Sequence, residues 1–177
     1  MTNRSKLILL RGPSGAGKST IAKALQQLSD RPTALVEQDV YRQLIFRGQD
    51  EKRKTRPARH EMIKASVDIA LTHGFDVIVE GFFYYPAYQS MVEAWLARDD
   101  VDAYPFYFDI SLEETHRRHQ TRPKASEFST EEMTSWYNLV RPLDVEGEII
   151  ITESMTTDET IDIICKTVGL SSNAVGA

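Results

Sequence analysis

The chain has 177 residues, of which 41% are hydrophobic and 27% charged, and its formal net charge is −5. These values are typical of a soluble globular protein, so we expect one domain over residues 1–170 and a disordered polar tail at 171–177. The negative net charge disfavours nucleic-acid binding by electrostatic attraction alone. The sequence shows neither a signal peptide nor a long apolar run, so we expect a cytoplasmic protein with no membrane partner.

The first predicted strand, Lys6 to Arg11, leads into a glycine-rich stretch that fits the phosphate-binding pattern G-x-x-x-x-G-K-[ST]. The residues of this loop are Gly12, Pro13, Ser14, Gly15, Ala16, Gly17, Lys18, Ser19 and Thr20. The next residues, Ile21 to Leu28, contain no Gly or Pro and predict a helix. A buried strand before the loop and a helix after it are the context that the pattern needs, so a plain strand-to-helix turn is the weaker interpretation.

The chemistry of such a loop follows from its backbone. Glycines let the chain turn tightly, so that its N–H groups and the positive end of the next helix surround a phosphate. We expect Lys18 to reach the β- and γ-phosphates of ATP and the Ser19 hydroxyl to hold Mg²⁺. The motif alone does not separate a kinase from an ATPase, a GTPase or a motor.

A second strand is predicted at Thr33–Glu37, and two candidate site residues follow it. The carboxyl ends of strands line the ligand crevice of an open α/β sheet, which places Asp39 and Arg42 on the side of the phosphate loop. Asp39 is a candidate general base for an acceptor hydroxyl, with a helix N-cap as the equally weighted alternative. Arg42, one helical turn later, is a candidate clamp for an anionic acceptor, the alternative being a solvated arginine.

The segment 47–60 is basic, with six Lys or Arg side chains against two acidic ones, and a long helix is predicted from about Arg56 to His73. A third, continuously apolar strand is predicted at Asp76–Glu80. Glu80 is a candidate for orienting water or supporting the metal, as a Walker B-type acid does, or else it only marks the strand end.

Four aromatic residues follow this strand closely and could form the wall of an acceptor pocket. They are Phe82, Phe83, Tyr84 and Tyr85. We expect at least two of them to pack in the core. A helix is then predicted from about Pro86 to Ala97, and a fourth strand at Ala103–Asp109. Pro105 of this strand has no backbone N–H to donate to a neighbouring strand. It therefore predicts that the strand lies near a sheet edge or pairs late.

Three capping boxes mark the remaining helices, each a Ser or Thr with Glu three residues later. They begin at Ser111, Ser129 and Thr156, and the helices are expected to end near Gln120, Val140 and Val168. A fifth strand is predicted at Glu148–Thr152. Cys165, the single cysteine, excludes an internal disulfide and reads as a buried thiol. The four histidines have no convincing metal-ligand spacing.

Cationic residues between the first two capping boxes suit a lid over bound phosphates. We expect Arg122, in the polar loop 121–128, to act as the lid arginine, and Arg117 and Arg118 to form a solvated helix face. Strands that alternate with helices predict an α/β fold with a five-stranded parallel sheet covered by helices on both faces.

This layout, over about residues 6–168, resembles the small P-loop kinases of the AAA_33 and zeta-toxin-like group. The resemblance implies a P-loop NTPase fold of the nucleoside-monophosphate-kinase-like kind, with a central first strand and an arginine-bearing lid. The local strings are most similar to the 5′-hydroxyl polynucleotide kinase domain. Residues 39–43 resemble its D-x-Y-R-Q segment, which implies that Asp39 is the general base and that Arg42 grips a phosphate of the acceptor. Glu80 stands where that family usually has Asp, and Arg122 falls where its lid arginine lies.

The sequence therefore predicts an ATP- and Mg²⁺-dependent kinase that phosphorylates a hydroxyl, with a polynucleotide or nucleotide 5′-hydroxyl as the first acceptor class. Catalytic roles are expected for Lys18, Asp39 and Arg122, and acceptor contacts for Asp39, Arg42, Glu80 and Tyr84. A kinase for a sugar nucleotide, nucleoside or antibiotic is the alternative within the enzymes. A nucleotide-gated switch or binding module is the alternative from another class. It is disfavoured because the sequence has no N-K-x-D string and no D-x-x-G string directly after the third predicted strand. The predicted binding partners are ATP, the acceptor and at most a short nucleic acid. The protein is expected to be a monomer or a homodimer.

Overall fold

One parallel sheet organises the chain, and its strands lie in the order β2-β3-β1-β4-β5. The computed structural model describes residues 4–45, 55–84, 86–120, 129–143 and 145–170. The strands are β1 (Ser5–Arg11), β2 (Thr33–Glu37), β3 (Asp76–Gly81), β4 (Val101–Asp109) and β5 (Ile149–Thr152). The central position of β1 and the parallel pairing of all five strands confirm the predicted α/β architecture.

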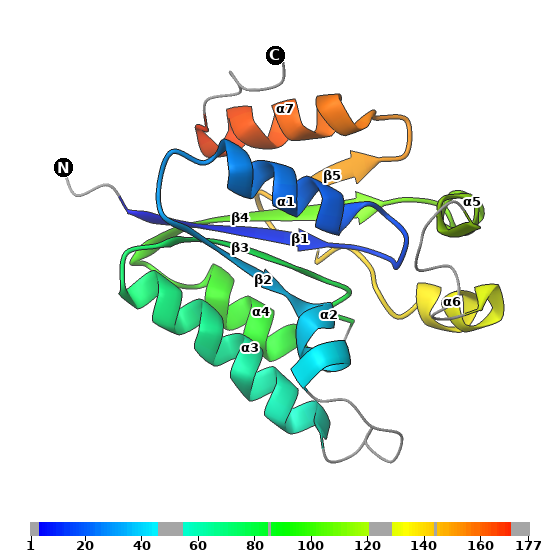
Figure 1. The fold of residues 1–177 in the computed structure, drawn as a ribbon, viewed down its shortest axis with the longest axis horizontal. Coiled ribbons are helices and arrows are strands. Elements are labelled where there is room, and N and C mark those ends of the chain that lie inside the picture. Colours follow the sequence, from blue (N-terminus) through cyan, green and yellow to red (C-terminus); the bar gives the residue numbers. More distant parts are fainter. Residues whose placement is uncertain (1–3, 46–54, 85, 121–128, 144, 171–177) are drawn as a thin grey trace.

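Helices cover both faces of this sheet (Figure 1). They are α1 (Lys18–Leu28), α2 (Gln38–Val40), the π-helical turn η1 (Tyr41–Ile45), α3 (Thr55–Thr72), α4 (Gln89–Leu96), α5 (Leu112–Gln120), α6 (Thr130–Tyr137) and α7 (Thr157–Val168). Figure 1 shows α1 and α7 on one face and α3 and α4 on the other. The short helices α2, α5 and α6 lie beyond the carboxyl ends of the strands, where the phosphate loop also lies.

Alternate residues of β1 explain why both faces need a helical cover. Leu7 and Leu9 belong to the core beneath α3 and α4, whereas Ile8 and Leu10 belong to the core beneath α1 and α7. A strand whose two faces are both buried reads as a continuous apolar run, which is the pattern that predicted it. Cys165 is buried in the second core, as expected.

The predicted strands agree with the structure to within two residues at each end, whereas two helices are shorter than predicted. The helix α4 starts at Gln89 instead of about Pro86, and α6 ends at Tyr137 instead of about Val140. As Pro105 predicted, β4 lies near a sheet edge, because its neighbour β5 is an edge strand. Its pairing with β5 begins only at Phe106, so Pro105 lies where just one neighbouring strand is present and its missing donor is tolerated.

Two of the three capping boxes are confirmed and the third is different. Ser129 with Glu132, and Thr156 with Glu159, make both reciprocal bonds. At Ser111, the hydroxyl accepts from the Glu114 backbone as predicted, but the Ser111 backbone N–H donates to the Glu153 carboxylate (2.9 Å) from the turn after β5. Glu114 is instead engaged by two arginines of its own helix. None of the described helices combines the length and the hydropathy that a membrane-spanning segment needs.

Candidate active site

The phosphate loop connects the carboxyl end of β1 to the first turn of α1, as the motif predicted. Its first glycine, Gly12, has a φ of 149°, and a Cβ atom there would lie 2.8 Å from the Cβ of Phe108 on β4. Gly17, in the N-cap position of α1, has the left-handed φ of 97°. Both positions therefore need glycine. The N–H groups of the first helical turn have no partners within the helix, so the loop can receive an anion.

Lys18 is held inside this loop. Its side chain is buried, and its ammonium group donates to the carbonyl oxygens of Gly12 (3.0 Å) and Pro13 (2.8 Å). A buried cation needs such hydrogen bonds. The loop thus keeps a positive charge at the place where the sequence motif expects phosphates.

A buried carboxylate lies beside the loop at the end of β3. Glu80 is only 4% exposed, and its carboxylate accepts a hydrogen bond of 2.9 Å from the Ser19 hydroxyl. Burial raises the pKa of Glu80, while the positive charge of Lys18 and the bond from Ser19 oppose that shift. A hydroxyl and a carboxylate are hard oxygen donors of the kind that Mg²⁺ takes. The described residues contain no group of three His, Cys, Asp or Glu side chains that could hold a metal by themselves. A metal here would therefore depend on phosphate oxygens and water, which also suits Mg²⁺.

Asp39 and Arg42 come together just after β2. The Arg42 Nε donates to the Asp39 carboxylate at 3.1 Å, and the two side chains are 43% and 54% exposed, respectively. The N-cap position of α2 is Glu37, so Asp39 lies inside the short helix and the capping alternative is wrong. Glu37 is the register partner of Glu80, and the charge of Asp39 adds to the upward shift of the Glu80 pKa that burial causes. The candidate residues after β2, Asp39 and Arg42, thus lie at the same end of the sheet as Glu80 of β3.

Two residues missed by the sequence analysis tie α2 to the end of β3. The Gln38 side-chain oxygen accepts from the backbone N–H groups of Phe82 (2.7 Å) and Phe83 (3.2 Å). Gly81 makes this approach possible, because a Cβ atom there would lie 2.5 Å from that oxygen. The glycine directly after Glu80 was the one signal for this contact in the sequence.

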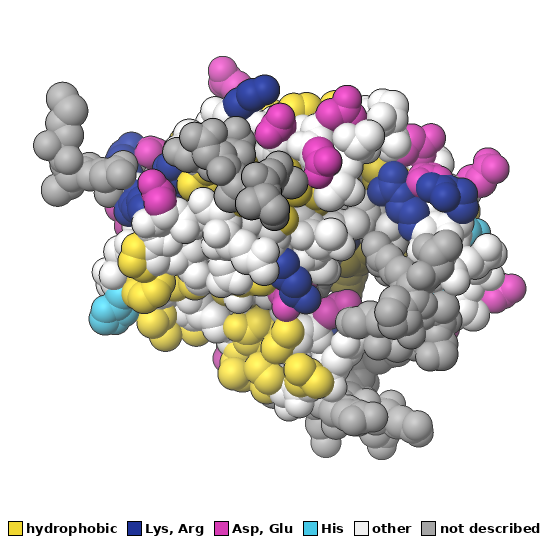
Figure 2. Space-filling view, turned by 45° about the horizontal axis from the view of Figure 1, so that its top comes forward, with side chains coloured by type: hydrophobic (Ala, Val, Ile, Leu, Met, Phe, Trp, Pro, Cys, Tyr) yellow, Lys and Arg dark blue, Asp and Glu magenta, His cyan; other side chains and the backbone are white. Residues whose placement is uncertain are grey.

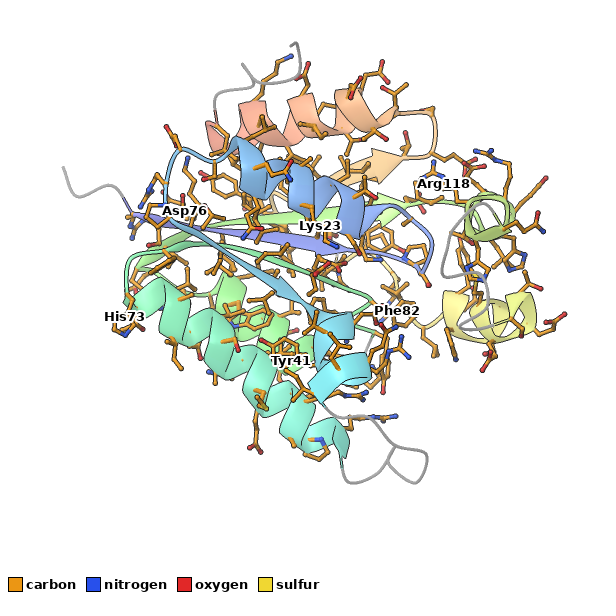
Figure 3. All side chains as sticks on the ribbon, viewed as in Figure 1. Lys23, Tyr41, His73, Asp76, Phe82 and Arg118 are labelled. Carbon is orange, nitrogen blue, oxygen red and sulfur yellow. The ribbon has the colours of Figure 1, made fainter. Side chains whose placement is uncertain are left out.

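The aromatic residues after β3 divide between core and surface. Phe83 is fully buried and has a positive φ of 37°, a conformation that costs a bulky residue about 1–3 kcal/mol and that the bonds from Gln38 help to hold. Tyr84 packs against the same core but stays partly exposed, and the Arg56 guanidinium lies 5.6 Å from its ring centroid. Phe82 is partly exposed beside α2 (Figure 3). Tyr85 lies outside the described residues.

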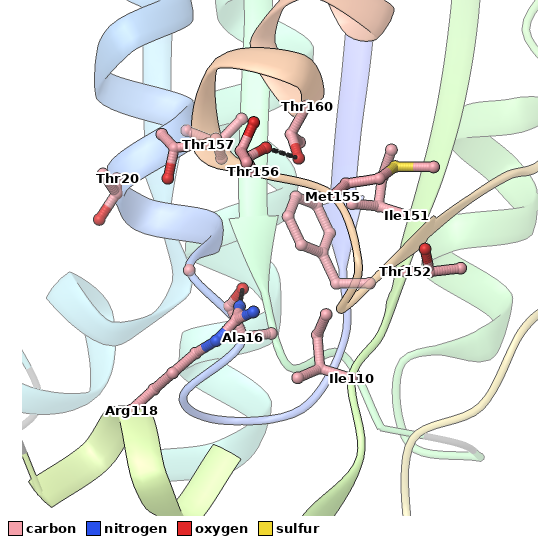
Figure 4. Close-up of a pocket in the computed structure, with 13 residues that line it drawn as sticks. Ala16, Thr20, Ile110, Arg118, Ile151, Thr152, Met155, Thr156, Thr157 and Thr160 are labelled. Atoms are coloured by element: carbon pink, nitrogen blue, oxygen red, sulfur yellow. Dashed lines mark hydrogen bonds between the residues drawn. The ribbon is translucent and has the colours of Figure 1, made fainter. Parts of the chain in front are cut away.

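The lid prediction needs a correction on α5. Arg122 lies outside the described residues, so its role stays a prediction. Arg118, expected to be solvated, reaches over the phosphate loop and donates to the Ala16 carbonyl oxygen at 3.1 Å (Figure 4). Arg117 is 70% exposed, as expected. Bonds from Arg117 and Arg118 lower the pKa of Glu114 to about 2, so this carboxylate stays charged and holds both arginines. Basic and acidic side chains gather at this end of the molecule (Figure 2).

A cavity of about 360 Å³ opens between Arg118, the start of α1 and the β5–α7 turn (Figure 4). Its lining residues are Ala16, Gly17, Thr20, Ile21, Phe108, Ile110, Arg118, Ile151, Thr152, Met155, Thr156, Thr157 and Thr160. The cavity begins at the phosphate loop itself. It therefore has the position and the size for the nucleoside part of a nucleotide whose phosphates lie in the loop.

A buried ion pair that no sequence motif indicated lies at the base of the loop. The Arg11 guanidinium lies 3.4 Å from the Glu148 carboxylate and also donates to the Arg141 carbonyl oxygen (3.2 Å). Glu148 in turn accepts from the Leu143 backbone N–H at 2.7 Å. The residue before Gly12 thereby fixes the segment that leads from α6 to β5.

Solved structures with this fold include several kinases. The Mycobacterium tuberculosis APS kinase CysC, in complex with AMPPNP and APS, has a TM-score of 0.73 and 16% identity over 94% of this chain and 98% of that one. A sugar kinase from Janibacter sp. HTCC2649 has a TM-score of 0.71 and 14% identity over 98% of this chain and 99% of that one. The Pnkp1/Rnl/Hen1 RNA repair complex has a TM-score of 0.60 and 23% identity over 78% of this chain and 45% of that one.

These structural likenesses show a shared fold. No curated protein matches the sequence. A sequence model of the AAA domain family (AAA_33) matches residues 7–153, so the chain belongs to this family and has the P-loop kinase fold of its structural neighbours.

Proposed function

We propose that this protein is an ATP- and Mg²⁺-dependent kinase that transfers the γ-phosphoryl group of ATP to a hydroxyl acceptor. The observation that carries the proposal is the meeting of three strand ends at one site. Lys18 and Ser19 follow β1, Asp39 follows β2, and Glu80 ends β3 between them. Phosphoryl transfer needs a phosphate cradle, charge neutralisation and an oriented acceptor, and these residue types can supply all three.

On the donor side, the loop amides and Lys18 bind the phosphates. The Lys18 ammonium exchanges its bonds with the Gly12 and Pro13 carbonyl oxygens for bonds with phosphate oxygens. Ser19 would hold Mg²⁺, with the Glu80 carboxylate beside it orienting the water around the metal. When bound, the metal neutralises charge on the phosphate oxygens. Arg118, on α5, covers the nucleotide. Arg122 remains the candidate residue for contacting the γ-phosphoryl group during transfer.

On the acceptor side, Asp39 takes the proton of the acceptor hydroxyl. That oxygen forms a bond to the γ-phosphorus while the bond from the same phosphorus to the bridging oxygen of ADP breaks, so the products are ADP and a phosphate ester. Arg42 orients the Asp39 carboxylate at 3.1 Å and is exposed enough to grip an anionic group of the acceptor as well.

For the acceptor we propose the 5′-hydroxyl of a short polynucleotide or of a nucleotide. Arg42 and Arg56 supply positive charge for a neighbouring phosphate, and Phe82 and Tyr84 offer partly exposed rings on which a base can stack. A small acceptor such as a sugar nucleotide is the second candidate. The observation that favours it is the net charge of −5, which is unfavourable for a long nucleic acid.

The test is transfer of labelled γ-phosphate from ATP to a panel of acceptors: 5′-hydroxyl DNA and RNA oligonucleotides, 3′-nucleotides, nucleosides, sugar nucleotides and aminoglycosides. We expect labelled oligonucleotides, and no label with the Lys18→Ala variant, which controls for contaminating kinases. Label in a small molecule alone would move the acceptor to the second candidate. A panel without any label, together with preference for GTP over ATP and response to a protein partner, would overturn the kinase proposal in favour of a switch.

A further inference from the structure

The short helix α2 carries the candidate base Asp39 but cannot fix its own place on the sheet. It consists of Gln38, Asp39 and Val40, and its N-cap residue Glu37 makes no capping bond with its side chain. A helix this short is not stable by itself. The Asp39 side chain is 54% exposed and bonds at 3.1 Å to Arg42, which lies one turn later in the same segment. The position of Asp39 relative to the phosphate loop therefore depends on how the segment is attached.

Gln38 attaches the segment to the end of β3. Its side-chain oxygen accepts from the backbone N–H groups of Phe82 (2.7 Å) and Phe83 (3.2 Å). Successive N–H groups that converge on one oxygen form a nest, and the positive φ of Phe83 (37°) suits that geometry. The approach is close, because a Cβ atom on Gly81 would lie 2.5 Å from the Gln38 oxygen and 2.6 Å from the Gln38 Cβ. Only glycine fits between the two elements.

The same Gln38 side chain is held by Tyr88, the residue directly before α4. Burial raises the pKa of the Tyr88 phenol, whereas a hydrogen bond with the Gln38 side chain lowers it. Tyr88 is only 2% exposed, and its ring centroid lies 3.9 Å from that of His60 on α3 and 5.3 Å from that of Phe83. A phenol packed from two sides keeps the Gln38 amide in one orientation.

This attachment ends next to the donor half of the site. Phe82 follows Glu80 by two residues, and the charge of Asp39 is near enough to add to the raised pKa of Glu80, which burial mainly causes. The segment has a second attachment, in which the Tyr41 hydroxyl donates to Ser66 of α3 at 2.7 Å. That bond leads to α3 and not to β3, so it serves as a control for the first.

We infer that Gln38 is a positioning residue for phosphoryl transfer, which holds the Asp39 carboxylate in place through its bonds to the Phe82 and Phe83 N–H groups. The inference rests on the proposed function, in which Asp39 accepts the proton of the acceptor hydroxyl. Displacing a reacting group by about 1 Å can lower a rate by ~10²-fold. Because the phosphate loop is built on β1 and α1, loss of the Gln38 bonds should lower kcat and spare nucleotide binding.

The experiment is a double-mutant cycle on the whole protein, with Gln38→Met, Asp39→Asn and both together. It measures transfer of labelled phosphate to a 5′-hydroxyl oligonucleotide or, if the wild type does not label that, to the panel member it labels most strongly. Gln38→Met should lower kcat by ~10–10²-fold, with the KM for ATP and the dissociation constant for ADP within about twofold of wild type. In the Asp39→Asn background it should lower kcat by less than about twofold, because residues that act through one group are not additive.

Two further variants separate positioning from a general loss of structure. Ser66→Ala removes the other attachment and should leave kcat within about twofold of wild type. Gln38→Glu keeps side-chain oxygens for the two N–H groups, and since a nest also accepts an anionic oxygen, it should recover most of the rate that Gln38→Met loses. Urea unfolding shows whether each variant is folded at the assay temperature.

A Gln38→Met protein that transfers at the wild-type rate, while Asp39→Asn is slow, would overturn the inference and leave the proposed kinase standing. An equal fall in both backgrounds, an equal fall in Ser66→Ala, or a Gln38→Glu protein as slow as Gln38→Met would also overturn it. Wild-type protein that labels no acceptor would overturn the proposed function instead. A wild-type rate in Asp39→Asn would remove the proposed base and this inference, with the phosphotransferase still standing.

Discussion

The two halves of the candidate site are built in different ways. In the donor half, Lys18 and Glu80 are buried. The Lys18 ammonium donates to two carbonyl oxygens of the loop, and the Glu80 carboxylate accepts from the Ser19 hydroxyl. In the acceptor half, Asp39 and Arg42 are exposed, bonded to each other, and attached to the sheet through the neighbouring Gln38. The donor half is thus fixed before any ligand arrives, whereas the acceptor half presents side chains on a surface.

This difference explains which property each half determines. A backbone cradle binds a phosphate whatever else the nucleotide carries, so we expect the donor half to determine the type of chemistry. The acceptor half draws on three separate segments, around Asp39, Arg56 and Tyr84, so changes on any of them can alter which hydroxyl is bound. If the comparison is correct, substitutions in the donor half should abolish the reaction with every acceptor, and those in the acceptor half should spare nucleotide binding.

The largest effect is expected from Lys18→Met, which keeps much of the side-chain length and removes the charge. Loss of a cation that neutralises transferring phosphate should lower kcat by ~10³-fold or more with every acceptor. Steady-state transfer of labelled phosphate measures this, and circular dichroism controls for folding. A folded Lys18→Met protein that retains a tenth of the activity would show that the loop takes no part in the chemistry.

The next largest effect is expected from Asp39→Asn. The amide can still bond to Arg42 but is a poor base, so transfer should fall by ~10²–10⁴-fold while the dissociation constant for ADP stays within about twofold. Parallel measurements of transfer and calorimetric binding separate the two. Transfer at wild-type level would leave Asp39 as a surface residue, and weakened ADP binding would contradict the division into two halves.

A smaller effect is expected on α5, where neighbouring arginines provide a matched pair. Arg118→Ala removes the contact over the phosphate loop, so the KM for ATP should rise about tenfold, which corresponds to ~1.4 kcal/mol. Arg117→Ala removes a 70% exposed side chain on the same helix and should change the KM for ATP by less than about twofold. Equal effects of the two variants would mean that Arg118 acts only through helix stability.

The smallest effect concerns the stability of the donor half. Burial raises the pKa of Glu80 above its ordinary value of 4.5, against the opposing influence of Lys18 and Ser19. Below pH 4.5 the group is protonated in both folded and unfolded protein, and as the pH rises through the raised pKa the folded state loses stability. The Glu80→Gln variant has no carboxylate at this position to ionise, so its stability does not fall in this way. Its free energy of unfolding should match that of the wild type near pH 4 and exceed it increasingly towards pH 8.

Urea titrations at several pH values measure this difference. A Glu80→Gln protein that is less stable than the wild type at pH 8 and equal to it at pH 4 would show that ionised Glu80 stabilises the fold. The same variant should transfer phosphate poorly at every pH, because an amide supports Mg²⁺ less well than a carboxylate does.

The fold could be predicted from the sequence because its signals are local. Apolar runs such as Asp76–Gly81 mark strands with two buried faces, and two capping boxes mark helix starts directly. An error arose where a distant segment intervened. At the Ser111 cap, the carboxylate of Glu153 takes the place expected for the Glu114 side chain. This contact cannot be read from the neighbours of Ser111 in the chain.

The geometry of the phosphate loop was equally predictable, since the loop motif places Lys18 and Ser19 at the start of a helix that follows a buried strand. The hydrogen bond between Ser19 and Glu80 fits the expected role of Glu80. The contact of Arg118 with the phosphate loop was missed because a charged residue on a charged helix looks solvated until the helix is placed against the loop. Gln38 was missed for the same reason, since its two backbone partners are more than 40 residues away in the chain.

The stoichiometry of the reaction distinguishes a kinase from an ATPase or a switch. Wild-type protein is incubated with labelled ATP, Mg²⁺ and a 5′-hydroxyl oligonucleotide, and ADP, free phosphate and labelled acceptor are counted together. For a kinase we expect about one labelled acceptor for each ADP formed, little free phosphate, and slow ATP consumption when the acceptor is left out. ADP and free phosphate in equal amounts, at a rate that no acceptor from the panel changes, would contradict it.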